Sequence, residues 1–111
     1  MHEYSLAEAL LKQVISHAPP GAKVERVVIE AGPLQGIEPY AMQTGWQLVT
    51  RDTSYARSVL EIVELPWPLH CPGCGRDWTS PAFPATCSCG CADSHPTGGS
   101  DLLLKSITIA D

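Results

Sequence analysis

The residues best suited to chemistry in this chain are five cysteines between positions 71 and 91. Cys71 and Cys74 have the C-x2-C spacing, and the glycine between them lets the backbone turn so that both thiolates face one ion. After twelve further residues comes the run CSCGC over residues 87–91. Two such clusters predict a tetrahedral four-thiolate zinc site, the closed type that leaves no coordination position open and serves structure.

The second cluster leaves one zinc ligand open, because no two of its cysteines have the two-residue spacing of the first pair. Cys89 is followed by a glycine, as Cys74 is, and this repeat favours Cys89 over Cys91. Iron bound by the same sulfurs would instead make a rubredoxin-like electron carrier, which is red where a zinc protein is colourless. The favoured zinc ligands are Cys71, Cys74, Cys87 and Cys89, with Cys91 as the alternative to Cys89.

A second candidate site is the start of the sequence, MHE. The Met1 amine, with the amide nitrogen and imidazole of His2, can close two chelate rings around one ion, and the Glu3 amide or carboxylate can complete a plane. Nitrogen-rich planar sites suit nickel(II) and copper(II). Ser5 and Glu8 match the S-x-x-E capping box, which predicts that residues 1–3 precede the helix as an arm. The alternative is an ordinary polar start, with Glu3 placing negative charge near a helix N-terminus.

Two helices and three strands are expected to position these residues. Apolar residues at three- and four-residue steps predict a helix from Leu6 to about Ala18, and Pro39 suits the first turn of a second helix. Gly45 weakens that second helix by about 1 kcal/mol relative to alanine, so packing must hold it. Runs rich in valine, isoleucine and leucine predict strands at Lys23–Ala31, Val59–Leu65 and Leu102–Ala110.

The segment 66–100 contains all five cysteines among dense proline and glycine, so its structure cannot come from periodicity, and a covalent link or a metal must hold it. The predicted fold class is therefore α+β. Residues 1–65 and 101–111 form a base domain of two helices on a three-stranded sheet, interrupted by a zinc-ribbon-like insert at 66–100 before the last strand.

Composition excludes several classes of function. A net charge of -5 argues against a nucleic-acid-binding surface. No apolar run approaches the roughly 20 residues of a membrane helix, and no basic segment precedes an apolar one as in a secretory signal. We therefore expect a cytoplasmic protein without a membrane partner. The sequence shows no paired carboxylates, nucleophile elbow or phosphate loop, so nothing in it requires an enzyme.

Four segments in combination resemble the HypA/HybF family of nickel metallochaperones for [NiFe]-hydrogenase maturation. They are MHEYSL, EAGPLQGIEPYAM, CPGCG and GGSDLLLKSITIAD, and the resemblance extends over essentially the whole chain. It implies a nickel site built from Met1, His2 and Glu3, with nickel as transported cargo, and a structural zinc site in the insert. The departure is at residues 87–91, where the family usually shows C-P-x-C.

The resemblance also implies partners. Members of this family pass nickel to the hydrogenase large-subunit precursor and work with the nickel-inserting GTPase of the pathway, and some also serve urease. For this chain we expect a monomer or weak homodimer. The alternative function is a zinc-ribbon protein-interaction module without nickel delivery, for which the cysteines alone would be adequate evidence.

Overall fold

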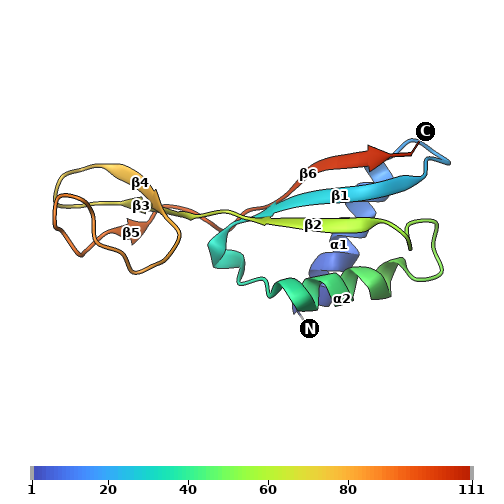
Figure 1. Cartoon of the computed structure of the whole chain (residues 1–111), viewed down its shortest axis with the longest axis horizontal. Coiled ribbons are helices and arrows are strands. Elements are labelled where there is room, and N and C mark those ends of the chain that lie inside the picture. The colour runs from blue at the N-terminus through green and yellow to red at the C-terminus, as the bar shows by residue number, and fades with distance from the viewer. Residues whose placement is uncertain (1, 111) are drawn as a thin grey trace. The chain divides into compact units, whose positions relative to one another are not determined.

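The computed structural model describes residues 2–110 (Figure 1), and its contacts divide the chain into two units. Unit 1 contains the chain up to Glu30, the segment Ile37–Val63 and the chain from Leu103 onward. Unit 2 contains Ala31–Gly36 and Glu64–Leu102. Unit 2 thus takes in residues 31–36, which the predicted insert does not include.

Unit 1 packs two helices against a sheet. Helix α1 spans His2–His17, and its buried residues recur at the three- and four-residue steps of an amphipathic helix. Helix α2 spans Pro39–Thr50, and its first residue is the proline that suits this position. The two helices contribute Ala7, Leu10, Val14, Met42 and Trp46 to the core.

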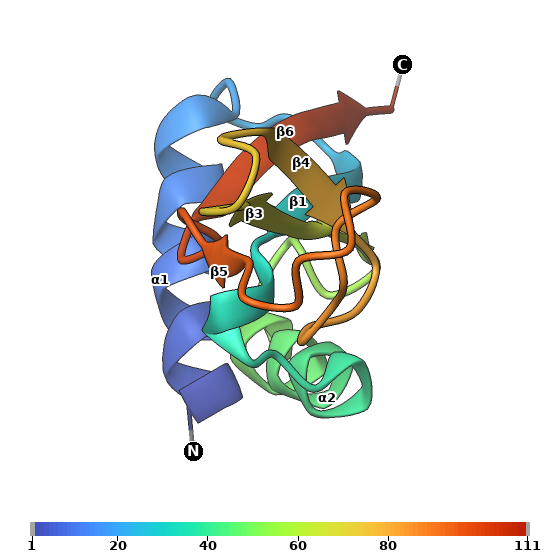
Figure 2. The same ribbon diagram turned by 90° about the vertical axis from the view of Figure 1, so that its left-hand side faces the viewer.

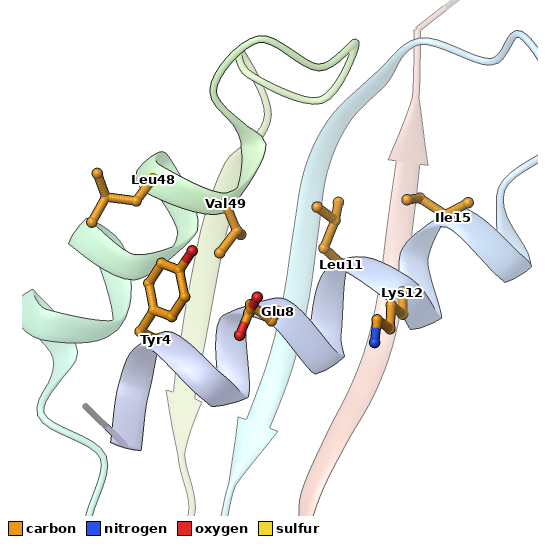
Figure 3. Close-up of a pocket in the computed structure, with 7 residues that line it drawn as sticks. All are labelled: Tyr4, Glu8, Leu11, Lys12, Ile15, Leu48 and Val49. Carbon is orange, nitrogen blue, oxygen red and sulfur yellow. The ribbon is translucent and has the colours of Figure 1, made fainter.

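The sheet of unit 1 has the strand order β2-β1-β6, with β1 at Val24–Ala31, β2 at Val59–Glu64 and β6 at Leu102–Ile109. The arrowheads in Figure 3 show β1 and β2 pointing the same way and β6 the opposite way, with both helices on one side of the sheet. Parallel neighbours need a long crossover connection, and α2 supplies it between β1 and β2. The sheet buries Val24, Val27, Ile29 and Leu60 beneath the helices.

Helices α1 and α2 approach closely at Gly45. A Cβ added to this glycine would lie 3.3 Å from the carbonyl oxygen of Glu3, 3.4 Å from the Ala7 Cβ and 3.5 Å from the Tyr4 Cα. The missing side chain therefore lets the first turns of α1 rest directly on α2. This contact is the packing that offsets the low helix propensity of Gly45.

The predicted N-terminal arm is wrong, because α1 begins at His2 and Ser5 lies inside the helix. Tertiary contacts explain the earlier start. The Glu3 carboxylate accepts a hydrogen bond from the backbone N–H of Glu38 at 3.2 Å, just before α2, and the backbone of Glu3 packs on Gly45. A capping box read from local sequence contains no information about either contact.

Unit 2 contains a second small sheet, which Figure 2 shows as β3, β4 and β5. Strand β3 (Trp67–His70) lies between β4 (Asp77–Ser80) and β5 (His95–Pro96), and both pairings are antiparallel. Residues Pro33–Gln35 add a 3-10 turn, η1. The sequence did not indicate these strands, because each is too short to carry a visible alternation.

The mixed α+β class with a cysteine-bearing segment before the last strand is confirmed. The predicted strands agree with β1, β2 and β6 to within a residue at either end, and the predicted second helix agrees with α2. Among residues 2–110, neither helix has the length and apolar character needed to cross a membrane.

Candidate metal centres

Four of the five cysteines converge in unit 2. The sulfur atoms of Cys71, Cys74, Cys87 and Cys89 all lie within 4.8 Å of one another. Cys71 Sγ lies 3.5 Å from Cys89 Sγ, and Cys74 Sγ lies 3.8 Å from Cys87 Sγ. Two of these side chains are buried and two are exposed, so the cluster sits at the edge of unit 2.

Two backbone turns, each ending on a glycine, bring these sulfurs together. In the first, the N–H of Gly75 donates to the carbonyl of Cys71 at 2.8 Å; in the second, the N–H of Gly90 donates to the carbonyl of Cys87 at 2.8 Å. Both glycines have positive φ angles, 75° and 94°, which L-residues with a side chain rarely adopt. The Cys-Gly repeat in the sequence thus marks two turns that each end on a glycine with positive φ, although the first hydrogen bond links residues four apart and the second links residues three apart.

Cys91 lies next to this cluster without joining it. Its sulfur is 3.2 Å from the position that a Cβ on Gly73 would occupy, so it packs against the first turn. Its backbone carbonyl accepts from the N–H of Cys87 at 3.0 Å, which closes the second turn. Among the described residues, the sulfurs that converge include that of Cys89 and not that of Cys91. This is the choice that the glycine after Cys89 favoured in the sequence.

The four sulfurs fit a tetrahedral zinc ion. With zinc–sulfur bonds of about 2.3 Å, neighbouring sulfurs of a tetrahedron lie about 3.8 Å apart, close to the two distances above. The protonation chemistry agrees with a cation at this point. The backbone amide of Cys74 lowers the pKa of the Cys71 thiol to about 6. For Cys89, the Cys91 amide lowers the pKa, but hydrogen bonds with the neighbouring cysteines and burial outweigh it and raise the pKa to about 12.

The opposite pKa shifts of Cys71 and Cys89 have one physical meaning. The pKa of Cys87 is also lowered, chiefly by the Cys89 amide. The pKa of Cys74 is raised, because the lowering effect of the Arg76 amide is outweighed by burial and its cysteine neighbours. Two thiols therefore ionise readily and the other two keep their protons, because several thiolates within about 5 Å repel one another. All four can be thiolates together only if a cation offsets that repulsion. The cluster therefore has the donor set, spacing and charge demand of a structural zinc site with no open coordination position.

The N-terminal candidate residues lie on the first turn of α1. His2 Nδ1 is 3.6 Å from Glu3 Oε2, and that same oxygen accepts the Glu38 N–H. This backbone hydrogen bond is the main reason that the pKa of Glu3 is lowered, with smaller contributions from its own amide and from His2. Met1, the third predicted member of this site, lies outside the described residues.

Glu38 is the residue that sequence reasoning missed. Its side chain caps α2 by accepting from the N–H of Ala41 at 2.6 Å, while its own N–H holds Glu3. Glutamate is not among the preferred N-cap residues, so it did not attract attention. Its position directly before a proline that opens a helix was the available signal.

An open groove runs between α1 and α2 beside this site (Figure 3). Tyr4, Leu11, Ile15 and Leu48 give it apolar walls, and Glu8 and Lys12 reach it with charged groups. It contains neither His2 nor Glu3, so it is a neighbour of the candidate metal ligands and not part of their geometry.

Comparisons with known proteins agree over the whole chain. A family model described as "Hydrogenase/urease nickel incorporation, metallochaperone, hypA" matches residues 1–109. The hydrogenase maturation factor HypA of Nostoc punctiforme is 32% identical over 111 residues, covering 100% of this chain and 97% of that protein. The protein of the same name from Alkalilimnicola ehrlichii is 36% identical over 112 residues, covering 98% of this chain and 99% of its own length.

Two solved structures share the fold. The solution structure of the Ni metallochaperone HypA from Helicobacter pylori matches with a TM-score of 0.64 at 24% identity, covering 98% of this chain and 97% of that one. A second structure, described as the solution structure of HypA protein, matches with a TM-score of 0.67 at 23% identity, covering 99% and 97%.

Proposed function

This chain belongs to the HypA family of hydrogenase-maturation nickel metallochaperones, and we propose that it binds nickel(II) at its N-terminus and delivers it to the large-subunit precursor of a [NiFe]-hydrogenase. The proposed ligands are the Met1 amine, the backbone nitrogen and imidazole of His2, and Glu3. The observation that carries the proposal is the placement of His2 and Glu3 side by side at the exposed start of α1, within the segment that the family model matches.

The start of a helix suits a ligand set built from backbone nitrogens. The first four N–H groups of an α-helix have no acceptor within the helix, so the amides of His2 and Glu3 can give up protons without breaking the hydrogen-bond ladder of α1. The positive end of the helix dipole also disfavours a bare dication. Loss of two amide protons offsets that repulsion, because the metal then sits between negative nitrogens.

The Glu3 carboxylate serves this site as an anchor in our proposal. Its Oε2 is engaged by the Glu38 N–H, and the backbone of Glu3 rests on Gly45. We therefore assign the coordinating role to the Glu3 amide nitrogen and the positioning role to its carboxylate. A nickel ion held at an exposed helix start by ligands that take up protons again can leave the protein, which a carrier requires.

The cysteine cluster has the complementary role. Zinc held by Cys71, Cys74, Cys87 and Cys89 is closed by four thiolates and stays with the protein as structure. The chain then acts as a carrier in the cytoplasm, as a monomer or weak homodimer, with no catalytic step of its own. Its proposed partners are the precursor and the nickel-inserting GTPase of the pathway.

Nickel(II) titration by calorimetry tests the proposed N-terminal site. The zinc-loaded protein with a free Met1 amine is compared with His2→Ala and with a variant that has one extra residue ahead of Met1. The matched control is His17→Ala, because His17 lies at the other end of α1 with its Nδ1 2.8 Å from the Gln13 carbonyl oxygen. We expect the tightest nickel-binding event in the protein and the control, and its loss in the other two variants.

Identical isotherms for all four proteins would contradict the N-terminal site and favour the zinc-ribbon interaction module. Delivery is measured separately, by mixing nickel-loaded protein with the precursor and the GTPase under nickel limitation. We expect nickel to enter the precursor from the intact protein and from His17→Ala, but not from His2→Ala.

A further inference from the structure

We propose that His70 and His95 form a second metal-binding site in unit 2, which takes an exposed divalent transition-metal ion such as nickel(II), and that Asp77 positions His70 for it. The site is separate from the four cysteines and from the N-terminus. It rests on the proposed function only in the choice of nickel(II) as the ion.

The register of the small sheet places the three side chains in one row. His70 on β3 is directly opposite Asp77 on β4 and directly opposite His95 on β5. Residues directly opposite in antiparallel strands point to the same face, with Cβ atoms about 4.5–5.5 Å apart. The row therefore crosses all three strands on a single face.

That face is the outer one. Leu69, one residue earlier on β3, is 1% exposed and is paired with Trp78 and Pro96 on the opposite face. His70 is half-buried, and Asp77 and His95 are exposed. An ion in solution can therefore reach the row without opening the core.

The hydrogen bond to Asp77 fixes which nitrogen of His70 is available. His70 Nδ1 lies 2.8 Å from Asp77 Oδ1, and an ionised carboxylate can only accept a hydrogen bond, so Nδ1 carries the proton. The lone pair is then on Nε2. A carboxylate that holds one imidazole nitrogen while the other binds a metal is the usual support of histidine ligands in metalloproteins.

The spacing of the two imidazoles suits one shared ion. The ring centroids of His70 and His95 are 5.5 Å apart. Two imidazoles bound to one metal at about 2.1 Å, with a tetrahedral angle between them, have ring centroids about 5 Å apart. Within residues 2–110, no hydrogen bond reaches Nε2 of His70 or either ring nitrogen of His95, so both are available as ligands.

The local charges also favour a cation here. Asp77 adds a negative charge directly beside His70. The nearest basic residue in sequence, Arg76, is turned to other partners: its Nη1 donates to Ser88 Oγ at 2.7 Å, and its guanidinium lies over the Trp78 ring. Two imidazoles with water completing the coordination match the preferences of nickel, copper and zinc ions.

The test uses the zinc-loaded full chain carrying His2→Ala, so that the N-terminal site cannot contribute. Nickel(II) is titrated into this protein and into three double variants that add His70→Ala, His95→Ala or, as the matched control, His17→Ala. We expect one binding event in His2→Ala and in the His17 control, and at least a tenfold weaker event in the other two. Adding Asp77→Asn should weaken binding by about tenfold, as for other residues that support a metal ligand.

Paramagnetic NMR on the His2→Ala protein locates the ion without altering the proposed ligands. Nickel(II) should broaden the ring signals of His70 and His95 at a concentration that leaves those of His17 sharp, and bound zinc should remain constant. Equal broadening of all three rings, or no saturable event in the His2→Ala protein, would overturn the site and leave a cross-strand histidine pair. Neither result bears on the N-terminal site, which the comparison of intact protein with His2→Ala tests by itself.

Discussion

The two candidate metal centres are built in opposite ways. The cysteine cluster has four donors already converged, but unit 2 around it has little apolar core. Within the described chain, Leu69 is the only buried apolar side chain of unit 2 larger than cysteine. The N-terminal candidate residues His2 and Glu3 lie at an exposed helix start, yet they stand on the main core of unit 1, which includes Trp46, Met42 and Ile29.

This difference indicates what supplies the folding free energy of each unit, a bound metal or a packed apolar core. In unit 2, a bound metal would supply much of the folding free energy that apolar burial does not, as in small zinc domains. In unit 1, the packed helices hold the candidate ligands in place whether or not a metal is present. The cysteine cluster would thus depend on its metal for folding, whereas the N-terminal candidate ligands would be held in place with or without one.

Removing the metal from unit 2 should have the largest effect. A chelator, or Cys87→Ser, is expected to unfold unit 2 while unit 1 stays folded, because structural zinc contributes on the order of 10 kcal/mol in comparable small domains. The indole N–H signals of two tryptophans report on the units separately. The Trp78 indole N–H, which donates to Ser94 Oγ, should shift to the resonance position of an unfolded chain. The Trp46 indole N–H, which donates to Ser58 Oγ, should keep its resonance position.

Cys91→Ser is the matched control for that prediction, since Cys91 lies beside the cluster without joining it. We expect full zinc content and an unchanged Trp78 signal. Loss of zinc in Cys91→Ser, together with its retention in Cys89→Ser, would exchange the two assignments. Joint unfolding of both units in Cys87→Ser would remove the contrast between them.

Gly45→Val should disturb the N-terminal site from the opposite helix. A Cβ at this position already lies 3.3 Å from the Glu3 carbonyl oxygen, so the two further methyl groups of valine must push α1 away. Overpacking of this kind costs about 1–3 kcal/mol. Chemical denaturation followed through Trp46 measures the loss, and nickel titration should show weaker binding.

Gly45→Ala is the control for that substitution. Alanine regains up to about 1 kcal/mol of helix propensity, which offsets a single tight contact, so stability close to that of the natural chain is expected. If valine and alanine gave the same stability, the close approach of the helices at Gly45 would not be a constraint on the N-terminal site.

Glu38→Ala should have a smaller effect, confined to unit 1. It removes the carboxylate that caps α2 through the Ala41 N–H but leaves the Glu38 N–H available to Glu3. Loss of an N-cap costs about 1 kcal/mol. Chemical denaturation followed through Trp46 should show this loss of stability. Glu38→Asp, which keeps a capping carboxylate, should retain most of the stability of the natural chain. Equal losses in both variants would contradict the capping role.

The sequence predicted what local pattern can encode. Strands β1, β2 and β6 are rich in branched apolar residues, and α2 opens at a proline, so their positions were visible without a structure. The presence of Cys89 in the cluster was also foreseeable, because Cys74 and Cys89 are each followed by a glycine with positive φ that ends a turn. These features depend on neighbours in the chain.

The features that the sequence did not predict depend on residues far apart. The start of α1 at His2 is set by Glu38 and Gly45, more than 30 positions away, and the local capping pattern at Ser5 pointed elsewhere. The row of Asp77, His70 and His95 exists only through the register of three short strands. Such pairings are decided by tertiary packing, and a single sequence carries no local record of them.

The smallest predicted effect concerns the pH dependence that Glu3 adds to unit 1. Its pKa is lowered in the folded state, chiefly by the Glu38 N–H, so the carboxylate is stabilised when ionised. The resulting stability is fully present above the unfolded pKa of about 4.3 and is lost as the pH falls through the lower folded value.

Glu3→Gln keeps an oxygen that can accept the hydrogen bond but cannot ionise. The difference in unfolding free energy between the natural chain and Glu3→Gln, followed through Trp46, should therefore shrink as the pH falls below the unfolded pKa and through the lower folded pKa of Glu3. A difference that stays constant over that range would mean that the anchor at the start of α1 acts through shape alone, and the charge on Glu3 would then have no part in holding the N-terminal site against α2.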